Sequence, residues 1–117
     1  MPRHRSLRLR LEHILKGIVR IEQLTAGRNV EDYLADEGLR EMVERNIARI
    51  SEAARHVPVG VRAAHPTIPW RQIVGVGSVI RHDYDQIDDL VMWTTATEEL
   101  VPLKAAVATM LSDLDTG

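Results

Sequence analysis

A chain of 117 residues, 44% of them hydrophobic and 27% charged, has the length and composition of one globular domain with its own core. The formal net charge of −2 argues against broad, non-specific binding of nucleic acid, and the absence of cysteine excludes disulfides and thiolate metal sites. Aromatic residues make up only 3% and phenylalanine is absent, so the core must be aliphatic, which favours helices over a β-sandwich.

The chain shows no sign of membrane association or of division into parts. No apolar run approaches the ~18 residues of a membrane-spanning helix, so we expect no membrane partner. The lack of cysteine fits a reducing compartment, and we expect a cytoplasmic protein. Because no repeat or low-complexity tract interrupts the sequence, we expect residues 1–117 to form a single domain.

A helix of about five turns is predicted near the N-terminus. Its apolar residues recur at spacings of three and four and form one stripe: Leu7, Leu11, Ile14, Leu15, Ile18, Ile21 and Leu24. Gly27 supplies a stop signal, and Asn29 resembles the N-cap of a short helical turn that follows. The arginine-rich start belongs to this helix rather than to a targeting peptide, because Glu12 and Glu22 lie inside the same periodic segment.

A second long helix is predicted from about Asp36 to Val57, and Pro58 ends it. Its expected buried face contains Leu39, Met42, Val43, Ile47, Ile50 and Ala54. Its expected solvent face contains Glu41, Glu44, Arg45, Arg49, Glu52 and Arg55.

The C-terminal part of the chain predicts two further helices. Pro69 fits the first turn of a third helix, and Asp85 or Asp88 is placed to cap a fourth whose apolar residues begin with Leu90 and Val91. Pro102 is expected to kink or split this last helix near residues 98–101. Four or five helices in antiparallel succession predict an all-α bundle.

Three reactive side chains, Arg81, His82 and Tyr84, gather where the third helix ends. They combine a fixed cation, a group that titrates near neutral pH and a phenol. Metal-free RNA cleavage needs a proton acceptor and donor and a cation beside phosphorus. Ser78 lies one turn before His82 on the same face and is placed to contact a phosphate or orient the imidazole, or to bond a carbonyl of its own helix. We expect the trio to open onto one solvent-filled pocket.

Other kinds of site are not supported by the residues. The aspartates between residues 83 and 89 lack the glycine and glutamate of a calcium loop, and the histidines lack zinc spacing. Gly75 and Gly77 begin a nucleotide-binding pattern that Ile80 breaks, so their expected use is a close contact between helices or subunits. We therefore expect neither a metal nor a cofactor. The trio by itself also fits a polar helix terminus without chemistry.

Several segments resemble the HepT-like proteins, which are the toxin halves of HEPN/MNT (type VII-like) toxin–antitoxin pairs. The segments are Thr-Ala-Gly-Arg28, Val-Glu-Arg-Asn-Ile-Ala-Arg-Ile-Ser-Glu-Ala-Ala54, Ile-Pro-Trp-Arg71 and Arg-His-Asp-Tyr84. The resemblance implies a HEPN-like helical bundle that forms a homodimer or higher assembly and includes metal-independent ribonucleases. It also implies an MNT-type nucleotidyltransferase antitoxin as partner, which silences the toxin by transferring AMP to a tyrosine.

The resemblance assigns roles to single positions. His82 matches the catalytic histidine of the family signature, and Tyr84 matches the tyrosine that accepts AMP. The usual Arg-Asn pair falls on Gly77 and Ser78, so both residues of the pair are missing. Arg81 resembles the arginine of a variant branch in which Arg-His-X-Tyr follows Gly-Asn, and it would serve with His82 as the catalytic pair.

Three hypotheses follow for the function. In the first, the chain is a toxin that acts on RNA as an endonuclease or tRNA-trimming enzyme, with Ser78 and Tyr84 helping to position substrate. In the second, the chain is catalytically degenerate and acts as binding partner and AMP acceptor of the nucleotidyltransferase. Restoring the family pair by Gly77→Arg with Ser78→Asn should then raise toxicity. In the third, the chain is a helical subunit of some other complex.

Overall fold

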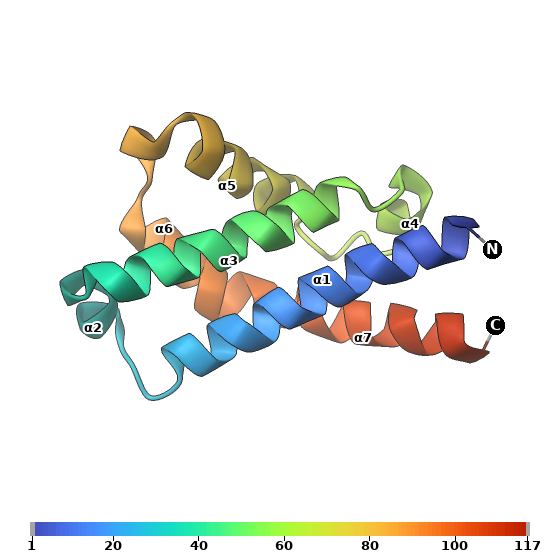
Figure 1. The fold of residues 1–117 in the computed structure, drawn as a ribbon, viewed down its shortest axis with the longest axis horizontal. Coiled ribbons are helices and arrows are strands. Elements are labelled where there is room, and N and C mark those ends of the chain that lie inside the picture. The colour runs from blue at the N-terminus through green and yellow to red at the C-terminus, as the bar shows by residue number, and fades with distance from the viewer. Residues whose placement is uncertain (1, 117) are drawn as a thin grey trace.

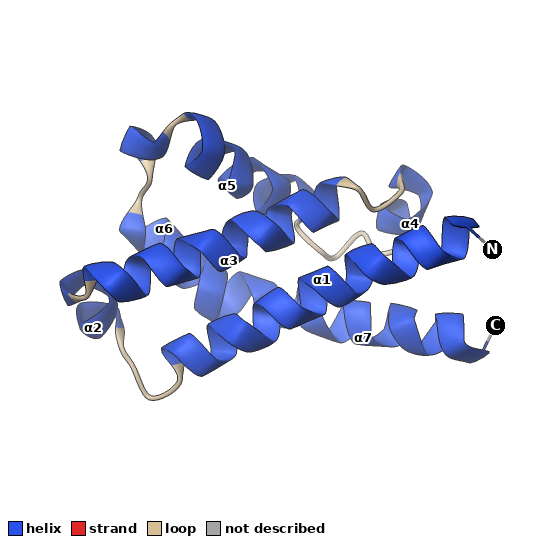
Figure 2. Ribbon diagram, viewed as in Figure 1, coloured by secondary structure: helices blue, strands red, loops and turns tan. Residues whose placement is uncertain are grey.

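The computed structural model describes the backbone of residues 2–116 and the side chains of residues 5–116. The helices are α1 (Pro2–Thr25), α2 (Val30–Ala35), α3 (Glu37–Arg55), α4 (Val59–Ala63), α5 (Trp70–His82), α6 (Asp89–Thr94) and α7 (Leu100–Thr116). A 3₁₀ turn (Tyr84–Gln86) follows α5, and a π-helical turn (Thr95–Glu99) joins α6 to α7. The described residues contain no strand (Figure 2), which confirms the all-α fold class.

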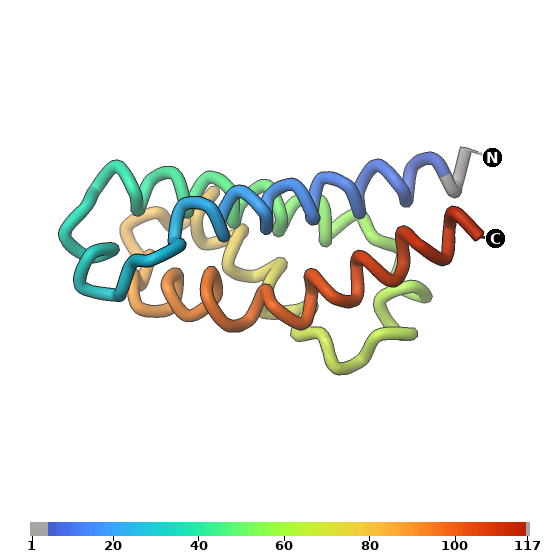
Figure 3. Tube along the Cα trace, turned by 90° about the horizontal axis from the view of Figure 1, so that it is seen from below, coloured from blue at the N-terminus to red at the C-terminus, as the bar shows by residue number. Residues whose placement is uncertain are grey.

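The two longest helices, α1 and α3, run antiparallel beside each other (Figure 1), and the other two long helices, α5 and α7, pack against them. α5 covers one side of α3, and α7 lies along α1. The beginning of α1 and the end of α7 meet at one end of the molecule (Figure 3), where Arg8 donates to Asp115 over 2.6 Å. The predicted stripe of α1 is confirmed, because its middle residues are fully buried: Leu11, Ile14, Ile18 and Ile21.

Side chains at the helix ends satisfy the free backbone groups there. Gly27, at φ +72°, turns the chain after α1 in a conformation that other residues rarely adopt. The Asn29 side chain accepts from the N–H of Asp32, whose carboxylate accepts from the N–H of Asn29, so the predicted cap is a full capping box. Asp36 caps α3, and Asp88 rather than Asp85 caps α6.

Pro102 splits the last predicted helix, as expected. Proline has no N–H, and its ring collides with the carbonyl four residues earlier in a regular helix, here that of Glu98. The backbone avoids this collision by widening into the π-helical turn that ends at Glu99, after which α7 runs regularly. The Thr97 hydroxyl, within this turn, donates to the carbonyl of Trp93 in α6 over 2.8 Å and satisfies that carbonyl.

Two residues of α3 lie on the opposite side from the one predicted, and two apolar residues of α6 are exposed. Met42, expected in the core, is 42% exposed, and Leu90 and Val91 are also exposed. Glu44, expected in solvent, is only 6% exposed. Glu44 is buried because α3 is covered on two sides, by α1 and by α5, and its buried arc extends toward α5.

No helix within the described residues is both long enough and apolar enough to cross a membrane.

Candidate functional site

Gly77 sets the distance between α5 and α3. A Cβ atom at this position would lie 1.9 Å from the Oγ and 2.3 Å from the Cβ of Ser51, which is far inside contact distance. Ser51 is fully buried, and its hydroxyl donates to the carbonyl of Val74 over 2.9 Å. The predicted close helix contact is confirmed for Gly77, whereas Gly75 has no atom within 4 Å of a Cβ added there.

Arg81 lies one turn after Gly77 and reaches back to α3. Its Nη1 is 3.5 Å from Oε2 of Glu52. Glu52 also accepts from Arg55 over 2.7 Å and interacts with Nε2 of His56 over 3.0 Å. The pKa of Glu52 is lowered to about 2. The main cause is the hydrogen bond from Arg55, followed by that from His56, and the charge of Arg81 adds to the effect. The guanidinium of Arg81 is thus held by an ionised carboxylate, while its side chain stays 33% exposed.

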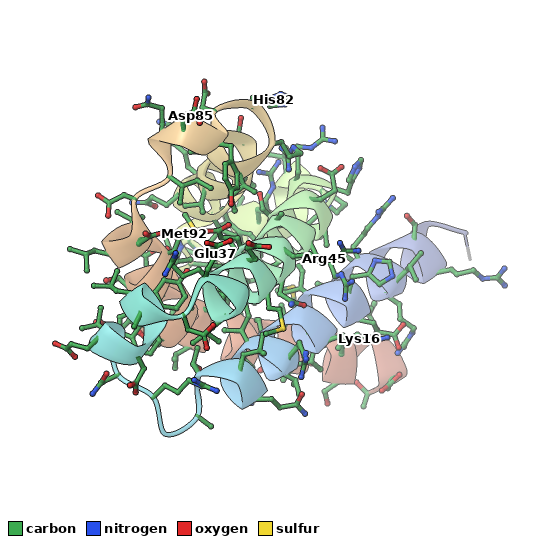
Figure 4. All side chains as sticks on the ribbon, turned by 60° about the vertical axis from the view of Figure 1, so that its left-hand side comes forward. Lys16, Glu37, Arg45, His82, Asp85 and Met92 are labelled. Atoms are coloured by element: carbon green, nitrogen blue, oxygen red, sulfur yellow. The ribbon has the colours of Figure 1, made fainter. Side chains whose placement is uncertain are left out.

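His82 is the last residue of α5 and projects into solvent, at the upper edge of Figure 4. Among the described residues, nothing forms a hydrogen bond or an ion pair with its ring. Both ring nitrogens are therefore available to accept a proton from a bound molecule or to deliver one to it.

Tyr84 opens the 3₁₀ turn after α5 and joins it to α3. Its hydroxyl donates to Oε1 of Glu44 over 3.0 Å, while 58% of the residue remains exposed. The hydrogen bond to Glu44, followed by the negative charge of that carboxylate, raises the pKa of the Tyr84 phenol above 10.0. Tyr84 thus lies at the surface, and the carboxylate beside its hydroxyl can act as a proton acceptor.

Glu44 is the residue of this site that sequence reasoning missed. Burial penalises its charged form and is the main reason that its pKa lies above the usual 4.5, and the hydrogen bond from Tyr84 opposes this effect. A glutamate within a run of charged residues on a helix carries no local signal that it will be covered. Only the position of α5 across α3 reveals its role.

The Glu44→Gln variant is expected to unfold at a higher temperature than the wild type at pH 8 and at the same temperature at pH 4. A glutamate whose pKa is raised by folding stabilises the fold in its protonated form below pH 4.5, and this stabilisation is lost as the pH rises through the raised value. Glutamine imitates the protonated form and can still accept from Tyr84. Thermal unfolding followed by circular dichroism at pH 4, 6 and 8 measures the difference.

Glu12→Gln is the matched control for this experiment, because it removes the same charge from an exposed position on α1, away from Glu44 and Tyr84. A lower unfolding temperature for Glu44→Gln than for the wild type at pH 8 would contradict the expectation. It would show that the buried carboxylate is favourable when charged.

The expectation of one shared pocket is not met within a single chain. The acids that hold Arg81 and Tyr84 are Glu52 and Glu44, which are eight residues apart on α3, or about 12 Å along its axis. His82 contacts neither acid. Ser78 is exposed and its hydroxyl forms no hydrogen bond within the described residues, so neither a bond to His82 nor one to a carbonyl of its own helix is present. Its contact with a phosphate stays a prediction.

In the part of the chain that is described, no three His, Cys, Asp or Glu side chains are grouped as ligands for an ion. Two of the acidic residues after α5 have structural partners: Asp88 caps α6, and Asp89 lies 3.9 Å from Nε of Arg40.

Comparison with known proteins gives a consistent result. Residues 14–110 match the family model described as "Ribonuclease HepT-like". The "Probable ribonuclease HepT" of Thermococcus cleftensis is 34% identical over 94 residues, which cover 80% of this chain and 86% of that protein. The "Putative RNase TTE0752" of Caldanaerobacter subterraneus subsp. tengcongensis is 29% identical over 101 residues, covering 86% of this chain and 90% of the relative.

One relative is longer. The match to "Gamma-glutamylcyclotransferase and putative RNase MJ0434" of Methanocaldococcus jannaschii covers 95% of this chain at 25% identity, but the chain spans only 50% of that protein. No solved structure matches the chain.

Proposed function

Because this chain belongs to the HepT-like ribonuclease family, we propose that it is a metal-independent RNA endonuclease or tRNA-trimming enzyme. We further propose that it is the toxin of a toxin–antitoxin pair and acts in the cytoplasm, where its substrate is. The observation that carries the activity is the free imidazole of His82 at the exposed end of α5, directly after Arg81.

The proposed reaction uses groups that this chain supplies. His82 takes the proton of a ribose 2′-hydroxyl, and the 2′-oxygen attacks the adjacent phosphorus. Arg81 stabilises the charge that builds up on the phosphate oxygens. The bond between phosphorus and the 5′-oxygen breaks, a protonated histidine gives that oxygen its proton, and the products end in a 2′,3′-cyclic phosphate and a 5′-hydroxyl.

A homodimer would complete this arrangement. The attacking and leaving oxygens lie on opposite sides of phosphorus, so one imidazole is poorly placed to serve both, and a second copy supplies a second His82. Apolar residues suited to a subunit contact follow α5 in the chain: Leu90 is 57% exposed and Val91 is 46% exposed.

The activity is tested by incubating the purified protein with end-labelled RNA in the presence of a metal chelator. Cleavage that leaves 2′,3′-cyclic phosphate ends is the expected result. RNA that stays intact in the chelator but is cut when a divalent metal is added would overturn the metal-independent reaction.

We propose that an MNT-type nucleotidyltransferase silences the enzyme by modifying Tyr84. The phenol oxygen would attack the α-phosphorus of ATP and release pyrophosphate, while its proton passes to Glu44, 3.0 Å away. The attached AMP would add a bulky charged group two residues after His82 and obstruct access to its ring. In this proposal Glu44 accepts the proton of the side chain that is modified.

Tyr84→Phe is expected to abolish the gain of AMP when the protein is incubated with the nucleotidyltransferase and ATP, because the attacking oxygen is gone. Tyr33→Phe is the matched control, since the chain has two tyrosines and Tyr33 is fully buried. Intact-mass spectrometry measures the gain. AMP found on the Tyr84→Phe protein would place the modification elsewhere.

A second function is favoured by two contacts. Arg81 is engaged by Glu52, and Gly77 leaves no room for the arginine that the family signature has there. In this alternative the chain no longer cuts RNA and acts as the binding partner and AMP acceptor of the nucleotidyltransferase. AMP transfer to Tyr84 without RNA cleavage supports the alternative, and growth arrest that co-expression of the nucleotidyltransferase relieves supports the toxin.

A further inference from the structure

A groove between α1 and α3 is lined by cations and by no acid. Lys16 and Arg20 come from α1, Arg45 and Arg49 come from α3, and the groove has a volume of about 390 Å³. Its remaining lining residues are Met42 and Asn46. Within residues 5–116, none of the four cations forms an ion pair, although other arginines of the chain do.

The close approach of the two helices creates this groove. Gly17 lies on α1 between the two cations, and a Cβ there would be 2.7 Å from Cγ1 of Ile50 on α3. The absence of a side chain at Gly17 lets the helices approach, and their solvent edges then carry the cations side by side. Figure 4 shows Lys16 and Arg45 on neighbouring helices, apart from His82 at the end of α5.

Like charges lie one helical turn apart on both walls of the groove. Lys16 and Arg20 are four residues apart, as are Arg45 and Arg49, and like charges at this spacing destabilise a helix by a few tenths of a kcal/mol per pair. The whole chain has a net charge of −2, so the groove is a local exception to its composition. An anionic ligand would remove the repulsion.

The basic surface continues beyond the groove and points toward the site on α5. A second hollow beside it, of about 260 Å³, is lined by His13, Lys16 and Arg49. In the same direction along α3, Arg45 and Glu52 are seven residues apart, which places them about 20° apart around the helix and about 10 Å apart along it. Glu52 is the acid that holds Arg81, so the groove and the α5 end share one face of α3.

We propose that this α1/α3 groove binds the sugar-phosphate backbone of single-stranded RNA and directs it to the end of α5. The proposal rests on the ribonuclease function proposed above and adds the site that holds the substrate. Cations one helical turn apart, about 5–6 Å, can each contact a different phosphate. The exposed thioether of Met42 offers an apolar surface to a base or ribose.

Binding is measured with fluorescein-labelled single-stranded RNA in a metal chelator, with every protein carrying His82→Ala so that no RNA is cut. Arg45→Gln with Arg49→Gln is expected to weaken binding at least about tenfold at low salt. The slope of log Kd against log salt concentration should fall by about 1.4, because each phosphate contact of a single strand contributes about 0.7. Lys16→Gln with Arg20→Gln tests the same groove from α1.

Arg8→Gln with Lys104→Gln is the matched control, because it removes the same charge from two cations that already pair with Asp115 and Glu22. Control binding should equal that of His82→Ala alone. Equal affinity of the control and of both groove variants would overturn the proposal. So would a change from dimer to monomer in the groove variants by sedimentation, which would make the groove a subunit interface.

Failure of the groove can be told apart from failure of the ribonuclease function. If the chain with His82 intact cuts no RNA while the groove variants lose RNA binding, the groove is supported and the nuclease reaction is wrong. If the chain cuts RNA and the groove variants bind and cut as the control does, the nuclease reaction stands and the groove proposal is wrong.

Discussion

His82→Ala is expected to lower the rate of metal-free RNA cleavage by about 10²–10⁴-fold, the range that general acid–base catalysis contributes. The imidazole ends α5 in solvent and has no partner within the described residues, so its removal takes away no internal contact. The fold and the unfolding temperature should therefore stay unchanged. Initial rates on end-labelled RNA in a chelator, with circular dichroism of the same samples, measure both quantities.

His65→Ala is the control for this loss. His65 lies in the segment between α4 and α5, and its contribution to the fold is its backbone carbonyl, which accepts from Nε1 of Trp70 over 3.0 Å. Alanine keeps that carbonyl, so cleavage should continue at the wild-type rate. Equal cleavage by His82→Ala and the wild type would rule out His82 as the catalytic group.

Gly77→Ala is expected to destabilise the fold by about 1–3 kcal/mol or more, because it overpacks the contact between α5 and α3. The new Cβ would lie 2.3 Å from the Cβ of Ser51, an atom that cannot rotate away. The helices must therefore separate, and the hydrogen bond from Ser51 to Val74 stretches or breaks. Chemical denaturation of the wild type and the variant measures the loss.

Changes at Ser51 identify the cause of this destabilisation. Ser51→Gly removes both atoms that collide and should recover part of the stability in the Gly77→Ala background, although glycine within a helix costs about 1 kcal/mol by itself. Ser51→Ala keeps its Cβ and should recover little. Equal stability of Gly77→Ala and the wild type would show that the helices adjust without cost.

The same contact alters the expected result of restoring the family's Arg-Asn pair. Gly77→Arg with Ser78→Asn places a large side chain where a single methyl group already collides with Ser51. The double variant should therefore lose stability before it can gain toxicity. In this chain Arg81, one turn later and 33% exposed, is the arginine next to His82.

The positions of the helices could be predicted because the signals are local. The period of the apolar residues marks α1 and α3, and Asn29, Asp36 and Asp88 cap helices through side chains that bond backbone two or three residues away. Pro102 disturbs the last helix through its own ring. Each effect depends on residues within about one helical turn, so one sequence is enough to recognise it.

The candidate site was predicted only in part. The order Arg81-His82-X-Tyr84 locates it at the end of α5. A histidine at an exposed helix end is expected to have no side-chain partner, so the state of His82 could be predicted from its position. The partners of Arg81 and Tyr84 come from α3, about 30 and 40 residues earlier in the chain. The burial of Glu44 and the cationic groove beside Met42 also cannot be predicted from the spacing of apolar residues.

The helices could be predicted and the contacts of the site could not, because the two depend on interactions of different range along the chain. Hydrophobic period, caps and proline determine where a helix begins, ends and turns its apolar face, because these are interactions within one segment. Which acid meets which cation depends on how two helices are rotated and shifted against each other. In this protein those offsets depend on two close contacts, Gly77 with Ser51 and Gly17 with Ile50, and neither can be recognised until the helices are packed.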